Sequence, residues 1–499
     1  MTGIEQHLPA LQVVVPMLVA PLVILLRPKG LAWAACTAAS ILAFAIAINI
    51  THAVLASGPL TYAMGSWPAP YGIALRIDTF SALLLLVVTG ASALTLAGGR
   101  ESFDSQISAE RQPYFFAAWL LALTGLAGIV ITADAFNIFV FMEISSLASY
   151  VLISGGPDRR ALPSVFKYLI MGTIGATFYL IGIGLIYMMT GTLNLTDMEY
   201  RIHEVADQRP ILAAAGFITV GLALKAAIFP LHVWLPNAYT YAPHVVTAFL
   251  AACSTKVSLY VLLRFDFFVF QGNLAGHAFQ FTVFLLPLAL LAILVGSSVA
   301  MFEKNLKRLL AFSSVAQIGY MMLGASLVTV AGLSAGILHI FNHALAKGAL
   351  FLAVASVAMA ASGLRLDELG GIARRMPWTF AAFVIAGLSL IGIPGTAGFI
   401  SKWYLISAAM ELGAIGLPVV AVILISSLMA VVYVWRIVEA AYFGSKSADP
   451  TPAEVGRVSP ALVAIAWVAA LANIYFGLVP ELPLDLSRAA ATDLLGHLP

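Results

Sequence analysis

Apolar residues follow one another in long stretches along almost the whole chain, separated by short polar segments. A helix needs about 20 mainly apolar residues to cross the hydrocarbon core of a bilayer. The stretches predict fourteen membrane-spanning helices: 9–26, 30–54, 78–98, 112–133, 135–155, 162–190, 210–239, 243–271, 278–302, 305–329, 332–362, 378–412, 416–444 and 458–479. The pattern therefore predicts an all-α, polytopic membrane protein.

Two connecting segments have a different character. Residues 59–77 alternate apolar and polar positions around Gly-Ser and Pro-Ala-Pro, which predicts a hairpin between the second and third helices. Residues 191–209 carry acidic and basic residues and are expected to form a polar loop.

The composition excludes most other classes of protein. Apolar residues make up 61% of the chain and charged residues 10%, against roughly 45–50% and about 25% in soluble domains. A water-soluble enzyme, a nucleic-acid binder and a disordered chain are thereby excluded. The two cysteines lie far apart with no C-x-x-C, and there is no GxGxxG or P-loop motif, so no metal or cofactor site is expected.

Basic residues in the loops predict the orientation. Loops after odd-numbered helices carry Arg27, Lys29, Arg100, Arg111, Arg159, Arg160, Lys304, Lys307, Arg308, Arg365, Arg374, Arg375, Lys446 and Arg457, whereas the opposite side carries Arg76, Arg201, Arg209 and Arg488. The odd-numbered loops should thus face the cytoplasm and both termini the outside. No basic residue precedes the first apolar stretch, so no cleavable signal peptide is expected.

The remaining basic residues lie inside predicted helices. Arg264 and Arg436, like Asp266, Glu411 and Glu439, lie in last turns, where snorkelling or pairing gives them a structural role. Five lysines lie deeper: Lys167, Lys225, Lys256, Lys347 and Lys402. A central lysine facing lipid costs about 2.5–3.5 kcal/mol, so these five should face a polar interior and are functional candidates.

Other ionisable groups complete a candidate path for protons. Glu143 is the only mid-membrane acid in the first half and is the expected counter-ion of Lys225 or Lys256. His339, His343 and Lys347 follow at i, i+4 and i+8, on one helical face. Burial disfavours a charged lysine and a carboxylate favours it, so a lysine with a movable partner can exchange protons at neutral pH.

Helix breakers interrupt two predicted spans. Pro230 follows Lys225, with His232 and His244 flanking the broken region, and Pro394 lies in a glycine-rich stretch before Lys402. Such breaks are tolerated in a bilayer where they line a cavity, and paired breaks point to a transport site. The breaks fall in the seventh and twelfth helices, five apart, which predicts two inverted five-helix repeats. The expected units are 1–111, 112–271, 272–445 and 446–499.

Several motifs resemble one known family. They are Glu143 in FME, Lys225 in LALKAAIFPLHVWLP, LKRLLAFSSVAQIGYMMLG at 306–324, HIFNHALAKGALF at 339–351 and GIPGTAGFISKW at 392–403. In this order they resemble the antiporter-like membrane subunits: the L, M and N subunits of NADH–quinone oxidoreductase and the A and D subunits of Mrp sodium/proton antiporters.

The resemblance implies roles for the matching residues. Glu143 and Lys225 match the acid–lysine pair, Lys256 the lysine of the eighth helix, and His343 and Lys347 the central pair of the eleventh. Lys402 stands where M subunits carry glutamate, which argues against that type, and the lack of a long lateral helix argues against the L and A types. The run from 235 to 265 looks more like the D type of Mrp antiporters.

The function implied is a proton-translocating subunit of a multisubunit Na⁺ or K⁺/proton antiporter in a bacterial inner membrane, without enzymatic chemistry of its own. Its partners would be small Mrp-type subunits and a large A-type subunit. The alternative is an N-like proton-pumping subunit of NADH–quinone oxidoreductase or a membrane-bound hydrogenase. A stand-alone solute transporter and a purely structural subunit are two further readings; against the former, the ionisable groups are spread over several helices.

Overall fold

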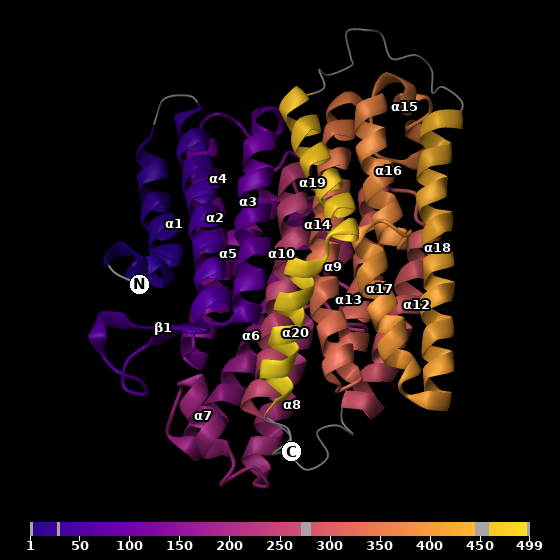
Figure 1. The fold of residues 1–499 in the computed structure, drawn as a ribbon. Coiled ribbons are helices and arrows are strands. Elements are labelled where there is room, and N and C mark those ends of the chain that lie inside the picture. The colour runs from indigo at the N-terminus through magenta and orange to yellow at the C-terminus, as the bar shows by residue number, and fades with distance from the viewer. Residues whose placement is uncertain (1–2, 27–29, 271–280, 445–458, 497–499) are drawn as a thin grey trace.

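The protein is a bundle of helices that run roughly along one common direction (Figure 1). The computed structural model describes residues 3–26, 30–270, 281–444 and 459–496. The first half contains η1 (Gly3–His7), α1 (Leu8–Leu25), α2 (Leu31–Ser57), β1 (Leu60–Ala63), η2 (Met64–Ser66), β2 (Ala74–Ile77), α3 (Thr79–Gln106), α4 (Gln112–Ile131), α5 (Ala135–Ser154), α6 (Ala161–Thr190), α7 (Leu195–Ile202), α8 (Arg209–Lys225), α9 (Leu235–Tyr241), α10 (His244–Leu263) and η3 (Arg264–Val269).

The second half also consists mainly of helices. It contains η4 (Phe281–Leu285), α12 (Leu286–Phe302), α13 (Leu306–Ser326), α14 (Val330–Ala360), η5 (Leu366–Glu368), α15 (Ile372–Arg375), α16 (Pro377–Ile391), α17 (Ala397–Met410), η6 (Gly413–Ile415), α18 (Gly416–Phe443), α19 (Pro460–Leu478) and α20 (Glu481–Leu495). Arg27, Lys29, Lys446 and Arg457, used above for the orientation, lie outside the described residues.

Among the described residues, 12 helices are long and apolar enough to cross a membrane, which confirms the all-α membrane class. The two other predicted spans, 210–239 and 378–412, are each two shorter helices separated by a break. α8 ends at Lys225 before α9, and α16 ends at Ile391 before α17. Both predicted breaks are therefore present; the count of fourteen crossings and the inverted repeat stay predictions.

The centre of the bundle is formed by three helices. In the most apolar stretch of 18 residues, the share of buried residues is 89% in α4, 89% in α10 with η3 and 94% in α13. The same share is 28% in α18 with η6, at the periphery. The enclosed part of such a helix cannot present charge to lipid or water, so a buried ionisable side chain on α10 or α13 must find its partners inside the protein.

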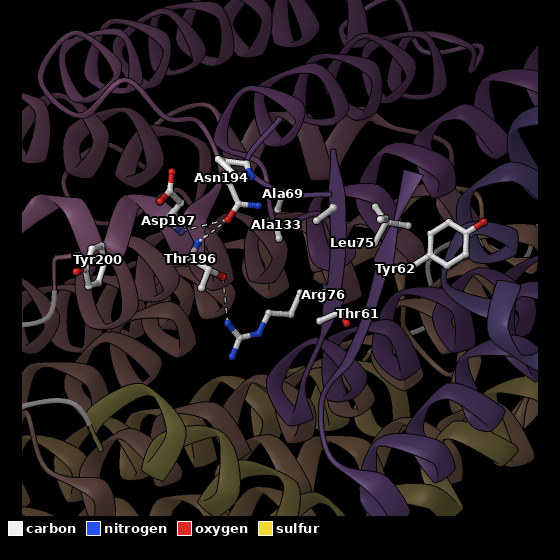
Figure 2. Close-up of a pocket in the computed structure, with 13 residues that line it drawn as sticks. Thr61, Tyr62, Ala69, Leu75, Arg76, Ala133, Asn194, Thr196, Asp197 and Tyr200 are labelled. Atoms are coloured by element: carbon white, nitrogen blue, oxygen red, sulfur yellow. Dashed lines mark hydrogen bonds between the residues drawn. The ribbon is translucent and has the colours of Figure 1, made fainter. Parts of the chain in front are cut away.

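The segment after α2 confirms the predicted hairpin. β1 and β2 pair antiparallel, with Leu60 opposite Ile77. The polar loop predicted at 191–209 instead contains α7, because Asn194 caps it by accepting from two backbone N–H groups. Figure 2 shows Arg76 of β2 reaching Thr196 at the start of α7 (Nη1···Oγ1 3.2 Å), beside a cavity of about 540 Å³.

The end of the chain differs from the prediction. The sequence predicts a last span at 458–479 with a tail behind it, but α19 ends at Leu478 and α20 continues from Glu481. α20 packs against α14 and α3. Its exposed face carries Glu481, Asp485 and Arg488, and this charge hid the helix from a search for apolar stretches.

A buried ion pair connects α3 to the end of α10. Arg264 Nη1 lies 2.6 Å from Asp78 Oδ2, and Nη2 lies 2.6 Å from Oδ1. Arg264 Nε also donates to the Tyr260 hydroxyl at 3.2 Å. Arg264 was expected to have a structural role at a helix end, and its partner, Asp78, is the N-cap residue of α3.

We predict that Asp78→Asn destabilises the fold by about 3–5 kcal/mol, because it leaves a buried guanidinium without a carboxylate. Thermal unfolding of the purified protein in detergent measures this. Asp367→Asn is the matched control, since Asp367 also pairs with an arginine but at the surface. An equal midpoint for the two variants would contradict the structural role of the pair.

Candidate functional site

Glu143 and Lys225 form an ion pair beside the first break. Lys225 is the last residue of α8, and its Nζ lies 3.0 Å from Glu143 Oε1 of α5 and 2.8 Å from Ser146 Oγ. The side chain of Lys225 is 4% exposed and that of Glu143 28%. The predicted counter-ion is therefore correct for Lys225, and the pair is accessible only from the carboxylate side.

Lys256 lies on the enclosed helix α10 and is 1% exposed. Its ammonium donates to the carbonyl of Ala251 one turn earlier. Among the described residues it has no carboxylate within ion-pair distance, so Glu143 serves Lys225 alone. The hydrogen-bond partner of this buried ammonium is thus a backbone carbonyl and not an acid.

Tyr168 of α6 connects these two lysine sites, although no charge or motif in the sequence marks it as a candidate. Its ring stacks on Trp234 at 3.9 Å between centroids, and its hydroxyl interacts with Ser254, two residues before Lys256. Trp234 in turn donates from Nε1 to the carbonyl of Leu224 at 2.9 Å, next to Lys225. The aromatic pair thus fixes the broken segment between the two lysines.

The predicted stripe His339, His343 and Lys347 lies inside α14 and is buried. The rings of His339 and His343 stack at 6.2 Å between centroids. Lys347 donates to the Leu310 carbonyl at 2.7 Å and to the Ser313 hydroxyl. Lys256, Lys347 and His339 all lie close enough to His343 to act on it electrostatically, so the structure brings these four groups together.

The two histidines differ in their partners. His339 is held from two sides, by Ser401 Oγ at Nδ1 and by Gln317 Oε1 at Nε2, both at 2.9 Å. Both ring nitrogens of His343 lack a hydrogen-bond partner among the described residues, although the side chain is 2% exposed. Buried polar groups of this kind are normally satisfied by water.

Lys402 lies at the second break, as predicted. Its Nζ donates to the carbonyls of Leu390 and Ile391 at 3.2 and 2.8 Å and to Ser427 Oγ at 3.1 Å. These carbonyls end α16, so the ammonium sits at the negative end of a half-helix dipole. Lys402 also lies 4.9 Å from the ring centroid of Tyr320, which contacts His339.

The other candidates take different positions. Lys167 is exposed on α6, so the expectation that it faces a polar interior is wrong for this chain in isolation. Pro230 and Pro394 lie in the two breaks. His232 is half-buried beside Phe229, with Nδ1 unpartnered among the described residues.

Lys307 is buried, although its sequence context predicts a loop. It is 1% exposed near the start of α13, and its Nζ donates to the carbonyl of Ala242 at 2.6 Å. Ala242 is the C-cap of α9. Each broken element thus has a lysine at the carboxyl end of a half-helix, Lys307 at the first and Lys402 at the second. Its distance in sequence from the break concealed this role.

A membrane bundle with buried lysines around two broken helices defines the class of antiporter-like membrane subunits. The comparisons agree: the family described as NADH:quinone oxidoreductase/Mrp antiporter, TM, matches residues 132–430. The chain belongs to this family, as the resemblance implied.

Members of both kinds of complex are similar over most of the chain. The N subunit of NADH-quinone oxidoreductase from Desulforudis audaxviator is 41% identical over 458 residues, 89% of this chain and 90% of the relative. The D subunit of the Na(+)/H(+) antiporter from Bacillus subtilis is 29% identical over 459 residues, 92% of this chain and 91% of the relative. A chain of the Mrp complex from Dietzia sp. DQ12-45-1b superposes with a TM-score of 0.90 at 27% identity and covers 99% of this chain and 98% of its own.

We predict that Lys307→Met loosens the first broken element, because α9 loses a charged hydrogen bond worth about 1.5–3 kcal/mol. Amide hydrogen exchange over 235–247 should become about tenfold faster or more. Lys304→Met is the control, since Lys304 is exposed three residues earlier. Unchanged exchange in Lys307→Met would contradict the capping role.

Proposed function

We propose that this chain translocates protons as a subunit of a multisubunit Na⁺ or K⁺/proton antiporter. One observation carries the proposal: of the buried lysines 225, 256, 347 and 402, Lys225 alone has a carboxylate partner among the described residues. The charge of the other three is balanced only by carbonyls and hydroxyls. Groups held in this way change protonation when a neighbouring charge moves, which is what proton transfer requires.

Protons are taken up from the cytoplasmic side through a half-channel at the first break. The break between α8 and α9 supplies a polar backbone, and His232 lies beside it. The proton reaches the region of Lys225 and Lys256, which Tyr168 connects. Separation of Glu143 from Lys225 removes the charge that keeps Lys225 protonated and moves the proton on.

The second half of the path follows α14. His343 lies close to both Lys256 and Lys347, and in this proposal water bound at its ring nitrogens would join these groups. His339 passes charge towards Lys402 through Gln317, Ser401 and the region around Tyr320. Lys402 releases the proton into a second half-channel at the break between α16 and α17. The relay residues form one row: Glu143, Lys225, Lys256, His339, His343, Lys347 and Lys402.

The chain works in this account as one of several membrane subunits. A large A-type subunit and small Mrp-type subunits would supply cation exchange, in a bacterial inner membrane with both chain termini outside. The units 1–111, 112–271, 272–445 and 446–499 then serve as an N-terminal part, two inverted repeats and a C-terminal part. The two half-channels open to opposite sides because the repeats are inverted.

A second function is supported by the relative that is 41% identical and named as the N subunit of NADH-quinone oxidoreductase. The same relay would then be driven by redox chemistry in partner subunits, in that complex or in a membrane-bound hydrogenase. Purification of the native complex distinguishes the two, since redox partners bind iron–sulfur clusters and Mrp-type partners do not.

We predict that Lys225→Ala and Lys347→Ala each reduce proton-coupled exchange at least tenfold in vesicles that contain the assembled complex. Glu143→Ala should do similar damage, because Lys225 would lose its only carboxylate. Fluorescence of a pH dye during a cation pulse measures the rate. Wild-type exchange by a fully assembled Lys225→Ala or Lys347→Ala complex would refute the relay.

Lys167→Ala is the matched control for these variants. It also removes a lysine from a membrane helix, but one whose side chain is exposed outside the row. We expect it to keep at least about half of the wild-type rate. A loss as large as that of Lys225→Ala would show that lysine removal itself, rather than its place in the row, stops transport.

A further inference from the structure

α20 presents a charged face to the outside of the bundle. Glu481, Asp485 and Arg488 are all exposed and follow at i, i+4 and i+7, on one side of the helix. The opposite side is apolar and buried against α3 and α14, where Leu484, Leu486 and Leu494 lie. The helix is amphipathic in a place where most outer surfaces of the bundle are apolar.

This charged face lies at the depth of the hydrocarbon core. α16 and α17 have 15 and 14 residues, about 22 and 21 Å, so the break between them lies near the middle of the membrane. Gly477, just before α20, is packed so tightly on Gly395 and Thr396 of that break that a Cβ would lie within 2.6 Å of them. Figure 1 shows α19 and α20 meeting about halfway along the bundle.

The rise of α20 confines Glu481, Asp485 and Arg488 to the membrane interior, whereas Asp493, which is also exposed, lies near the end of the helix. From Glu481 to Arg488 the helix rises about 10 Å, whereas half of the hydrocarbon core measures about 15 Å. Leu482 lines an apolar cavity together with Phe341 and Ala344, which lie halfway along α14. The first turns of α20 are therefore level with the His343 region.

Lipid and a second copy of this chain are both incompatible with the charge of this face. Acyl chains cannot solvate carboxylates, and neither Glu481 nor Asp485 has an ion-pair partner among the described residues. A second copy of the chain also fails. Copies inserted in the same direction are related by an axis along the membrane normal, so Glu481 would face Glu481 and Asp485 would face Asp485.

We propose that the exposed face of α20 is covered by a transmembrane helix of a different subunit that carries a lysine or arginine against Glu481 and Asp485. The inference rests on the proposed function in one respect, namely that the chain works within a multisubunit complex. It places a helix of one of those subunits against α20 and gives that helix a basic residue.

The same face is connected to the second broken helix. Arg488 donates from Nη2 to the Tyr404 hydroxyl at 3.2 Å, and its guanidinium lies 5.5 Å from the centroid of that ring. Tyr404 is two residues from Lys402 on α17. A subunit seated on α20 thus bears on the helix that holds the last lysine of the row.

Photocrosslinking in native membranes tests the proposal. A benzophenone amino acid replaces Asp485 in the full chain within its complex, and as a control Leu428, which is 67% exposed on α18. We expect position 485 to react with another subunit of the purified complex, within an apolar segment that contains lysine or arginine, and position 428 to react with lipid. Reaction of position 485 with lipid alone, or with a second copy, would overturn the proposal.

Two variants test the charge and the exclusion of water. Asp485→Lys should reduce co-purification with the partner at least tenfold, whereas Asp485→Glu and the loop control Glu110→Lys retain it; equal recovery of Asp485→Lys argues against the basic partner. Asp485→Cys should resist a membrane-impermeant thiol reagent in the complex, where Cys36 and Cys253 are buried. Its rapid modification would mean a water-filled surface and would also overturn the proposal.

The outcome is separable from that of the proposed function. Exchange by Lys225→Ala is measured in the same vesicles, and it depends on the relay but not on which helix covers α20. A crosslink from position 485 to another subunit, together with wild-type exchange by Lys225→Ala, would support the interface and refute the relay. No such crosslink, together with a loss of exchange in Lys225→Ala, would refute only the interface.

Discussion

The cost of placing charge in hydrocarbon is the constraint on which the rest of this structure depends. Lys256, Lys347 and Lys402 lie where neither lipid nor bulk water can solvate an ammonium, so each is bonded to a backbone carbonyl of the protein. The carbonyls that bind Lys256 and Lys347 lie inside α10 and α13, where each oxygen has a second lone pair to offer, whereas those that bind Lys402 end α16 at the second break. At Lys402 the broken helix itself therefore supplies the acceptors for a buried ammonium.

In the proposed relay, the same constraint makes the two ends of the row different. One carboxylate lies at the Lys225 end, two histidines in the middle and a half-helix end at Lys402. Charge is therefore balanced strongly at one end and weakly along the rest. Glu143 acts electrostatically on Lys225 and on Tyr168, which leads towards Lys256. In the proposed relay this asymmetry, rather than any single side chain, couples the row to neighbouring subunits.

Much of this could be predicted from the sequence because charges are rare in it. The spans, the hairpin, both breaks and the pairing of Glu143 with Lys225 followed from apolar length, helix breakers and scarcity of acids. The sequence does not predict the burial or role of residues whose neighbours in the chain suggest a loop or a neutral helix face. Lys307 lies among loop charges, Gln317 and Tyr168 carry no charge, and α20 alternates charge with leucine. Lys167 lies in an apolar stretch, yet its side chain turns outward, because helical position and not sequence depth decides which side a residue faces.

The buried groups are proposed to form one connected path for protons. The surroundings of His343 test this path most directly, because both of its ring nitrogens lack a partner among the described residues. Cryo-electron microscopy of the assembled complex in a lipid nanodisc, at about 2 Å where ordered waters are resolved, addresses it directly. The account predicts waters bound to the two ring nitrogens of His343 that reach Lys256 on one side and Lys347 on the other. A dry, apolar contact around His343, with no water between these lysines, would contradict it.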